Sequence, residues 1–263
     1  MNSTLSPAHE RYLHRLKNSK RLIITSRILI AVIFMLSWEL LTRFNIIDAF
    51  IFSSPSRIVK CFMELASDGT IFRHIGITVG ETMLCFVIVI GLGITIAMIL
   101  WRFSTVFKIS EPYLVLLNSL PKSALAPLLI VWLGNNIKTI IVAAVSVAVF
   151  GAILSIYTAF METEPEKLKL MQTLKSTRMQ TLFKLVIPQS MPSIINTMKV
   201  NLGLSLVGVI IGEFLAAREG LGYMIIYATQ TFKMDWVLLA IVILCLLSIG
   251  LYQLINIIKG AFK

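Results

Sequence analysis

Charged residues are scarce in this sequence. Asp, Glu, Lys and Arg make up 14% of its 263 residues, whereas a soluble globular domain carries about 25%. Hydrophobic residues make up 57%. This composition excludes an ordinary soluble domain and predicts an all-α polytopic membrane protein.

Residues that could carry chemistry are also few. Cys61, Cys85 and Cys245 are far apart and lack the spacing of a metal or disulfide site. No phosphate-binding loop of the GxxxxGK[ST] type occurs, and no Ser/His/Asp or Cys/His set can be assembled. We therefore predict a chain with no catalytic site, no metal and no cofactor of its own.

Acidic residues are outnumbered by basic ones, which gives a net charge of +11. Such a balance can indicate nucleic acid as a partner. Here the basic residues flank apolar runs, as they do on the cytoplasmic side of membrane proteins, near anionic lipid. We therefore predict that this charge faces membrane lipid and not nucleic acid.

Six apolar runs come close to the about 20 residues that a helix needs to cross a bilayer. They cover residues 28–44, 75–100, 113–133, 137–160, 194–215 and 236–258. Lys and Arg concentrate before the first run, after the second and the fourth, and at the C-terminal end, which predicts that both termini are cytoplasmic. We expect a cytoplasmic tail over 1–27 and a transmembrane domain over 28–263, with its core at about 70–258.

The third and fifth runs contain unusual residues. Pro121 and Pro127 fall in one apolar run, which predicts either a harmless kink or a broken helix that lines a pathway. Gly208 and Gly212 form a small-xxx-small pair that lets helices approach closely. Glu213, near membrane depth, predicts either a structural partner or a pathway residue. The predicted pathway or gating residues are Pro121, Pro127, Ser205, Gly208 and Glu213.

Other polar residues near the spans predict structural roles. The segment 48–73 is expected to form a turn and then an amphipathic helix, capped by Ser54, with Pro55 in its first turn. Glu39 and Glu81, in the first and second runs, are expected to make structural hydrogen bonds.

The longest polar interruption between spans covers Glu162–Pro192. Its motifs at 163–166 and 177–180 both match a capping box, so we expect two short helices. Pro188 is expected to end the second helix. From the residues alone, a pair of basic helices with apolar faces could equally dock a partner or lie on anionic lipid.

Four motifs, in order along the chain, resemble one known family. FSSPSRIV precedes the second span, LPKSALAPLLIVWLG covers 120–134, FKLVIPQSMPSI covers 183–194 and GEFLAAREGLGYMI covers 212–225. Over roughly residues 50–258 the chain resembles the permease subunits of bacterial ABC importers of the nitrate, sulfonate and taurine type. The resemblance implies the type I importer permease fold, with about six transmembrane helices and a cytoplasmic two-helix coupling loop, here residues 161–193.

The resemblance also implies partners and a docking site. A second permease copy, a dimer of ABC ATPase subunits and an extracytoplasmic solute-binding protein would complete an importer in the bacterial inner membrane. ATP and Mg would be bound by the partner ATPase. The residues implied to dock the ATPase are Leu170, Met171, Lys175, Ser176, Thr177, Leu182, Phe183 and Pro188.

The coupling loop departs from the family pattern. The family's Glu-Ala-Ala falls at Lys169, Leu170 and Met171, and its loop glycine falls at Lys175. A glycine there normally supplies a left-handed turn. A lysine would cost about 1 kcal/mol in that conformation, or the turn is built differently. The departure predicts an altered contact with a dedicated ATPase.

Three functions stay open on the sequence. The first is the pathway subunit of an ATP-driven importer for a small solute, such as a sulfonate, taurine, nitrate or a related polar compound. The second is a secondary transporter or channel not coupled to ATP, which should show internal repeats or intramembrane charge pairs. The third is a degenerate, non-transporting membrane scaffold.

Overall fold

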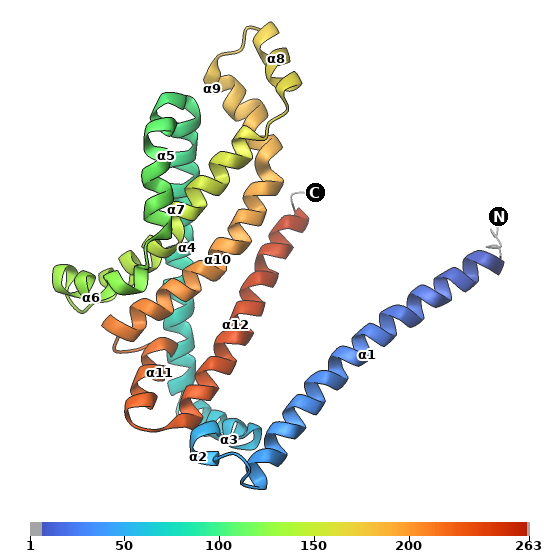
Figure 1. Ribbon diagram of the computed structural model, residues 1–263, viewed down its shortest axis with the longest axis vertical. Coiled ribbons are helices and arrows are strands. Elements are labelled where there is room, and N and C mark those ends of the chain that lie inside the picture. The colour runs from blue at the N-terminus through green and yellow to red at the C-terminus, as the bar shows by residue number, and fades with distance from the viewer. Residues whose placement is uncertain (1–6, 262–263) are drawn as a thin grey trace. The chain divides into compact units, whose positions relative to one another are not determined.

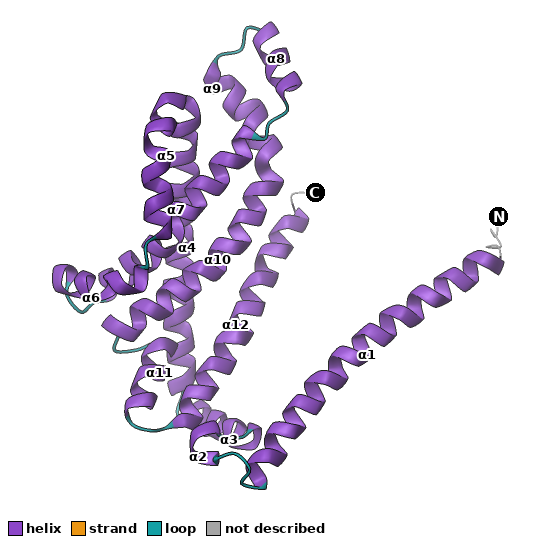
Figure 2. Ribbon diagram, viewed as in Figure 1, coloured by secondary structure: helices purple, strands orange, loops and turns teal. Residues whose placement is uncertain are grey.

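The computed structural model describes the backbone of residues 7–261, and every regular element in that range is a helix (Figures 1 and 2). The chain divides into two compact units, Met1–Cys61 and Phe62–Lys263. The all-α class that the sequence predicts is therefore confirmed.

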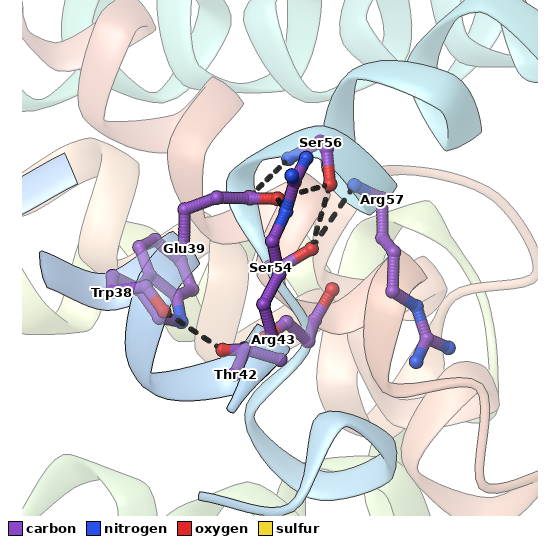
Figure 3. Close-up of polar contacts among 8 residues, drawn as sticks. Trp38, Glu39, Thr42, Arg43, Ser54, Ser56 and Arg57 are labelled. Carbon is purple, nitrogen blue, oxygen red and sulfur yellow. Dashed lines mark hydrogen bonds and ion pairs between the residues drawn. The ribbon is translucent and has the colours of Figure 1, made fainter. Parts of the chain in front are cut away.

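The first unit contains α1 (Pro7–Arg43), α2 (Ala49–Phe52) and the first half of α3 (Pro55–Ser67). Glu39, near the end of α1, accepts hydrogen bonds from the backbone N–H and the hydroxyl of Ser56, at 3.1 and 2.9 Å (Figure 3). Because the first N–H groups of a helix have no intrahelical acceptor, this carboxyl group caps α3. Glu39 thus makes the structural hydrogen bond that the sequence predicts.

The amphipathic helix expected after residue 48 is α3, and it begins at Pro55 as expected. Ile58, Cys61 and Leu65 are buried on one face of it. The backbone before it is held by the indole N–H of Trp38, which donates to the Phe52 carbonyl at 3.3 Å. The chain between α1 and α3 is therefore a hydrogen-bonded turn.

The second unit is a helical bundle with a hairpin of short helices at one end (Figure 1). It contains α4 (Thr70–Arg102), α5 (Ser104–Ser119), α6 (Lys122–Leu133), α7 (Ile137–Met161), α8 (Pro165–Thr173), α9 (Arg178–Thr181), α10 (Ile187–Ala216), α11 (Leu221–Gln230) and α12 (Met234–Ala261), with a π-helical turn at Leu182–Val186 between α9 and α10. Asp68 accepts the Thr70 N–H at 2.9 Å at the start of α4, and this backbone bond lowers the pKa of Asp68.

Five helices in the described part of the chain are long and apolar enough to cross a membrane. They cover Leu22–Arg43, Thr70–Arg102, Ile137–Met161, Arg178–Ala216 and Met234–Ile257. These match five of the six expected spans.

The remaining expected span, 113–133, is wrong as one continuous helix. It consists of α5 and α6, which are separated at Leu120 and Pro121. Leu120 is extended, with φ −61° and ψ 138°, because the ring of a following proline disfavours the α conformation. Pro127, by contrast, lies inside α6 without ending it. The break therefore comes from the first of the two prolines.

The core of the second unit lies where α7 packs against α4 and α10. A Cβ added at Gly208 would lie 2.7 Å from the Ala144 Cα, and one at Gly212 would lie 2.9 Å from the Ile140 Cα. Any side chain larger than hydrogen would therefore push α10 away from α7. The small-xxx-small pair predicted from the sequence is confirmed as a close helix contact.

Replacing Gly208 by Val should destabilise the bundle by about 1–3 kcal/mol, because the added atoms overpack the contact with Ala144. Gly203→Ala, on the same helix, is the matched control, since a Cβ there meets nothing within 4 Å. The stability of that control should be unchanged or higher, because Ala favours a helix by about 1 kcal/mol over Gly. Thermal unfolding in detergent measures both, and equal melting temperatures would contradict the close contact.

Candidate functional site

The coupling loop, residues 161–193, begins with α8. The N-cap of α8 is Glu164, which makes no side-chain cap bond, while the Thr163 hydroxyl donates to the Phe160 carbonyl at 2.9 Å. The capping box expected at 163–166 is therefore wrong, although the helix forms. Pro165 begins it, because proline has a fixed helical φ and no N–H group to satisfy.

The turn after α8 is left-handed at Lys175, whose φ is +53°. The Ser176 N–H donates to the Met171 carbonyl at 3.0 Å, and the Lys175 N–H donates to the Gln172 carbonyl at 2.9 Å. This pair of bonds is a Schellman motif, in which glycine is the usual left-handed residue. The turn therefore keeps the geometry that a glycine would favour and places a lysine in it.

The second expected capping box is present. The Thr177 hydroxyl accepts the Gln180 N–H at 3.2 Å, and the Gln180 side chain accepts the Thr177 N–H at 2.8 Å. The expectation that Pro188 ends this helix is wrong, because the chain continues through the π-helical turn at Leu182–Val186 into α10. Pro188 follows this turn inside the continuous helical stretch Arg178–Ala216. The Ile187 N–H donates to the Leu182 carbonyl, five residues earlier, and this wider π-helical turn accommodates the proline ring and its missing N–H.

The residues expected to dock the ATPase fall into exposed and buried groups. Leu170 and Phe183 are 59% and 56% exposed. Leu182 is only 1% exposed and belongs to the core cluster that includes Phe160 and Val186. Leu182 therefore holds the loop in place and does not form its surface. Of the others, Lys175, Thr177 and Pro188 are exposed, and Met171 and Ser176 are half-buried.

Hydrogen bonds fix the base of the coupling loop to the bundle. The Arg178 guanidinium donates to the Arg102 carbonyl at the end of α4, at 3.3 Å. The Ser190 hydroxyl donates to the Ala159 carbonyl of α7, at 2.9 Å. Because the loop also continues directly into α10, a displacement of the loop acts on three long helices at once.

The residues expected to line a pathway lie in different environments. Pro121 and Pro127 are exposed, at the start and in the middle of α6. Gly208 is buried against α7. Ser205 is fully buried, and its hydroxyl has no hydrogen-bond partner among the described residues.

Glu213 is 1% exposed, near the C-terminal end of α10. Its carboxyl oxygens accept hydrogen bonds from the Thr78 hydroxyl at 2.7 Å and from the Gly222 N–H at 2.6 Å. The Thr78 hydroxyl in turn accepts the Leu221 N–H at 2.8 Å. Glu81 on α4 also interacts with this carboxyl group. The arrangement ties α4 and α10 to the start of α11, which favours the structural role for Glu213.

The Gly-Leu-Gly turn before α11 fits around the Glu213 side chain. Gly220 has φ +110°, and its N–H donates to Nδ1 of His74 at 2.9 Å. A Cβ at Gly222 would lie 2.8 Å from the Cβ of Glu213. Both glycines are therefore required, one by its backbone conformation and the other by lack of space.

One polar cavity was missed by the sequence reasoning. Asn118, Ser155, Asn196 and Asn201 line it, between α5, α7 and α10. The sequence signal for this cavity is the spacing of polar residues. Within the fourth and fifth apolar runs they recur at intervals of three or four residues, so they share one helix face.

Replacing Glu213 by Gln should lower stability by about 1–3 kcal/mol although the two side chains have nearly the same shape. The Thr78 hydroxyl and the Gly222 N–H both donate to this side chain, and an amide offers one acceptor oxygen where the carboxyl group offers two. Glu219→Gln is the control, since Glu219 makes a surface ion pair with Arg73, worth about 0–1 kcal/mol. Thermal unfolding in detergent compares them; equal losses would argue against the buried network.

Replacing Lys175 by Gly should stabilise the protein by about 1 kcal/mol, because glycine adopts the left-handed conformation without a steric penalty. The control is Lys169→Gly, inside α8, which should destabilise by about 1 kcal/mol. Opposite shifts in melting temperature are expected. Shifts of the same sign would contradict the assignment of the strain to the turn.

The chain is similar to several proteins of known family. The chain is 28% identical over 215 residues to the formylaminopyrimidine transport permease protein ThiX of Halalkalibacterium halodurans, covering 82% of this chain and 85% of that protein. It is 24% identical over 217 residues to the putative aliphatic sulfonates transport permease protein SsuC of Bacillus subtilis, covering 82% and 78%.

Among solved structures, the chain resembles the inward-facing MetNI methionine ABC transporter, with a TM-score of 0.67 and 16% identity, covering 74% of this chain and 96% of that one. At this identity the likeness shows the fold alone. The family described as "Binding-protein-dependent transport system inner membrane component" matches residues 89–262. The chain therefore belongs to this family and is a multi-pass, non-catalytic permease component of an ABC importer, whose ATPase and binding protein are separate subunits.

Proposed function

We propose that this chain forms the path by which an ATP-driven importer moves a small polar solute, delivered by an extracytoplasmic binding protein, into the cell. The observation that carries the proposal is the coupling loop, a rigid two-helix element that is joined to three long helices. The names of two relatives include formylaminopyrimidine and aliphatic sulfonates, which supports a small polar organic solute here.

The ATPase would dock on the exposed apolar side chains of the coupling loop. Leu170, Leu174 and Phe183 are 59%, 67% and 56% exposed, on a segment that is otherwise basic. Large apolar side chains on a water-facing loop favour a protein partner. The Schellman turn and the capping box hold this surface in one conformation, which lowers the entropic cost of docking.

The proposal includes a topology and a second copy of the chain. Both termini and the coupling loop lie in the cytoplasm, because Lys and Arg concentrate in those segments. A second permease completes the path, because Ser155 and Asn196 line a cavity yet are exposed on a single chain. Polar side chains at membrane depth belong against protein or water and not against lipid.

Leu170→Glu and Phe183→Glu should each lower the amount of ATPase that co-purifies with a tagged permease by about tenfold or more, since an apolar anchor contributes about 2 kcal/mol or more. Phe232→Glu is the matched control, because Phe232 is 65% exposed in the turn between α11 and α12. It should leave recovery unchanged. Full recovery with both loop variants would rule out docking at this surface.

Uptake into proteoliposomes separates the importer from the other two functions. The vesicles contain the permease and its ATPase, with ATP inside and the binding protein outside. They should accumulate solute only when ATP and the binding protein are both supplied. An aminopyrimidine amide and an alkanesulfonate serve as labelled probes. Uptake that persists without ATP would indicate a secondary transporter or channel, and an assembled complex that moves neither these probes nor the binding protein's own bound solute would indicate a scaffold.

A further inference from the structure

Two cavities along α7 and α10 form one polar groove, because both are lined by Ser155 and Asn196. The volume of the first is about 320 Å³ and that of the second is about 410 Å³. The polar residues of the first are Asn118, Ser155, Asn196, Thr197 and Asn201. Those that the second adds are Thr158, Glu162 and Ser193.

The groove follows one stripe on each helix. Ser155 and Thr158 on α7 and Glu162, the C-cap of that helix, are spaced by three and four residues, so they share a face. Ser155, Thr158 and Asn196 are exposed, and they lie on helices long and apolar enough to cross a membrane. Amides and hydroxyls that face hydrocarbon are costly. The stripe therefore faces water, a solute or the second copy of the chain, and not lipid.

Asn201 lines the first cavity and has an unused acceptor. It is 2% exposed, and its amide nitrogen donates to the Thr197 carbonyl at 2.9 Å. Its Oδ1 has no hydrogen-bond partner among the described residues. A buried acceptor without a partner costs about 1–3 kcal/mol. On a cavity wall, water or the donor group of a solute removes that cost.

The first cavity has an uncharged lining. None of its described lining residues is Lys, Arg, Asp or Glu. The Lys122 ammonium donates to the Asn118 backbone carbonyl and is not among the residues that line the cavity. An ionised sulfonate or nitrate would lose hydration there without meeting a cation. It would also offer only acceptors to the Asn201 oxygen.

We propose that the polar groove is the inward half of the solute path, and that its first cavity selects a solute of zero net charge with N–H or O–H donors. Neutral amides and nitrogen heterocycles are members of this class. Asn201 is the specificity-determining residue, and its Oδ1 accepts a hydrogen bond from the solute. This inference rests on the proposed function and narrows its substrate.

The first experiment maps the groove with thiol reagents. Single cysteines replace Ser155, Thr158 and Asn196 in a chain whose three native cysteines are Ala, assembled with its ATPase in inverted membrane vesicles. A membrane-impermeant trimethylammonium-ethyl thiosulfonate should label them about tenfold faster than cysteines at Leu246 and Ile249, because a thiol in apolar surroundings does not ionise. Those two controls are exposed apolar residues of α12. Equal rates would overturn the groove as an aqueous path.

The second experiment tests the selection for a neutral solute. A cysteine at Leu204, which lines the first cavity, is compared with one at Thr158 for reagents of matched size. At each position the labelling rate of the sulfonate-bearing thiosulfonate is divided by that of its hydroxyethyl counterpart. This ratio should be about tenfold lower for the cysteine at Leu204 than for the one at Thr158. No loss would overturn the selection for a neutral solute.

Asn201 is tested in the Leu204→Cys background. Asn201→Asp should raise the ratio of cationic to neutral labelling by about tenfold, because a carboxylate would then face the cavity. An unchanged ratio would show that the side chain does not face the path. If the labelling rates are as expected but ATP-driven uptake does not occur, the proposed importer function is wrong and the groove assignment stands. If uptake occurs but the labelling rates differ from those expected, only the groove assignment is wrong.

Discussion

The close contact between α10 and α7 is the interaction on which the rest of the second unit depends. Lipid gives no hydrophobic driving force between helices, so their association relies on packing at short distance. Gly208 and Gly212 permit that distance, since a side chain at either position would collide with the backbone of α7. The same helix pair carries Glu213 at one end, the polar groove along its length and the coupling loop at the other end.

The coupling loop keeps a fixed geometry although its sequence departs from the resembled family. Lys175 adopts the left-handed conformation, and the Schellman bonds of Lys175 and Ser176 compensate its steric cost of about 1 kcal/mol. The turn thus has the geometry that a glycine would favour, while its surface carries a lysine side chain. Lys175 adds a positive charge at a position where glycine would have no side chain, which supports a partner ATPase with a complementary surface.

The sequence predicted the presence of the helices better than their ends or the roles of single residues. Composition and run length were sufficient for five spans, and the Thr177 capping box formed as expected. Pro121 broke the third span, whereas Pro188 did not end its helix, because a π-helical turn before Pro188 accommodates the proline. Whether such a turn forms is decided by the tertiary structure and cannot be read from the residue alone.

The candidate site shows the same limit. Exposed Leu170 and buried Leu182 are both apolar residues of one loop, and only packing separates a docking surface from a core residue. Glu213 was left open between two roles, and its two donors, one of them the backbone N–H of Gly222, come from segments that the sequence could not bring together. Asn201 was missed because the sequence shows neither its unpaired oxygen nor the cavity that the residue lines.

The central claim is that the coupling loop is where an ATPase acts on this permease. Site-specific photo-crosslinking in native membranes tests it most directly, with a photoreactive residue placed at Leu170 and, separately, at Phe232 on the turn between α11 and α12. The account predicts an adduct with the ATPase subunit from Leu170 and none from Phe232. An adduct from neither position, in membranes where the ATPase is present, would contradict it.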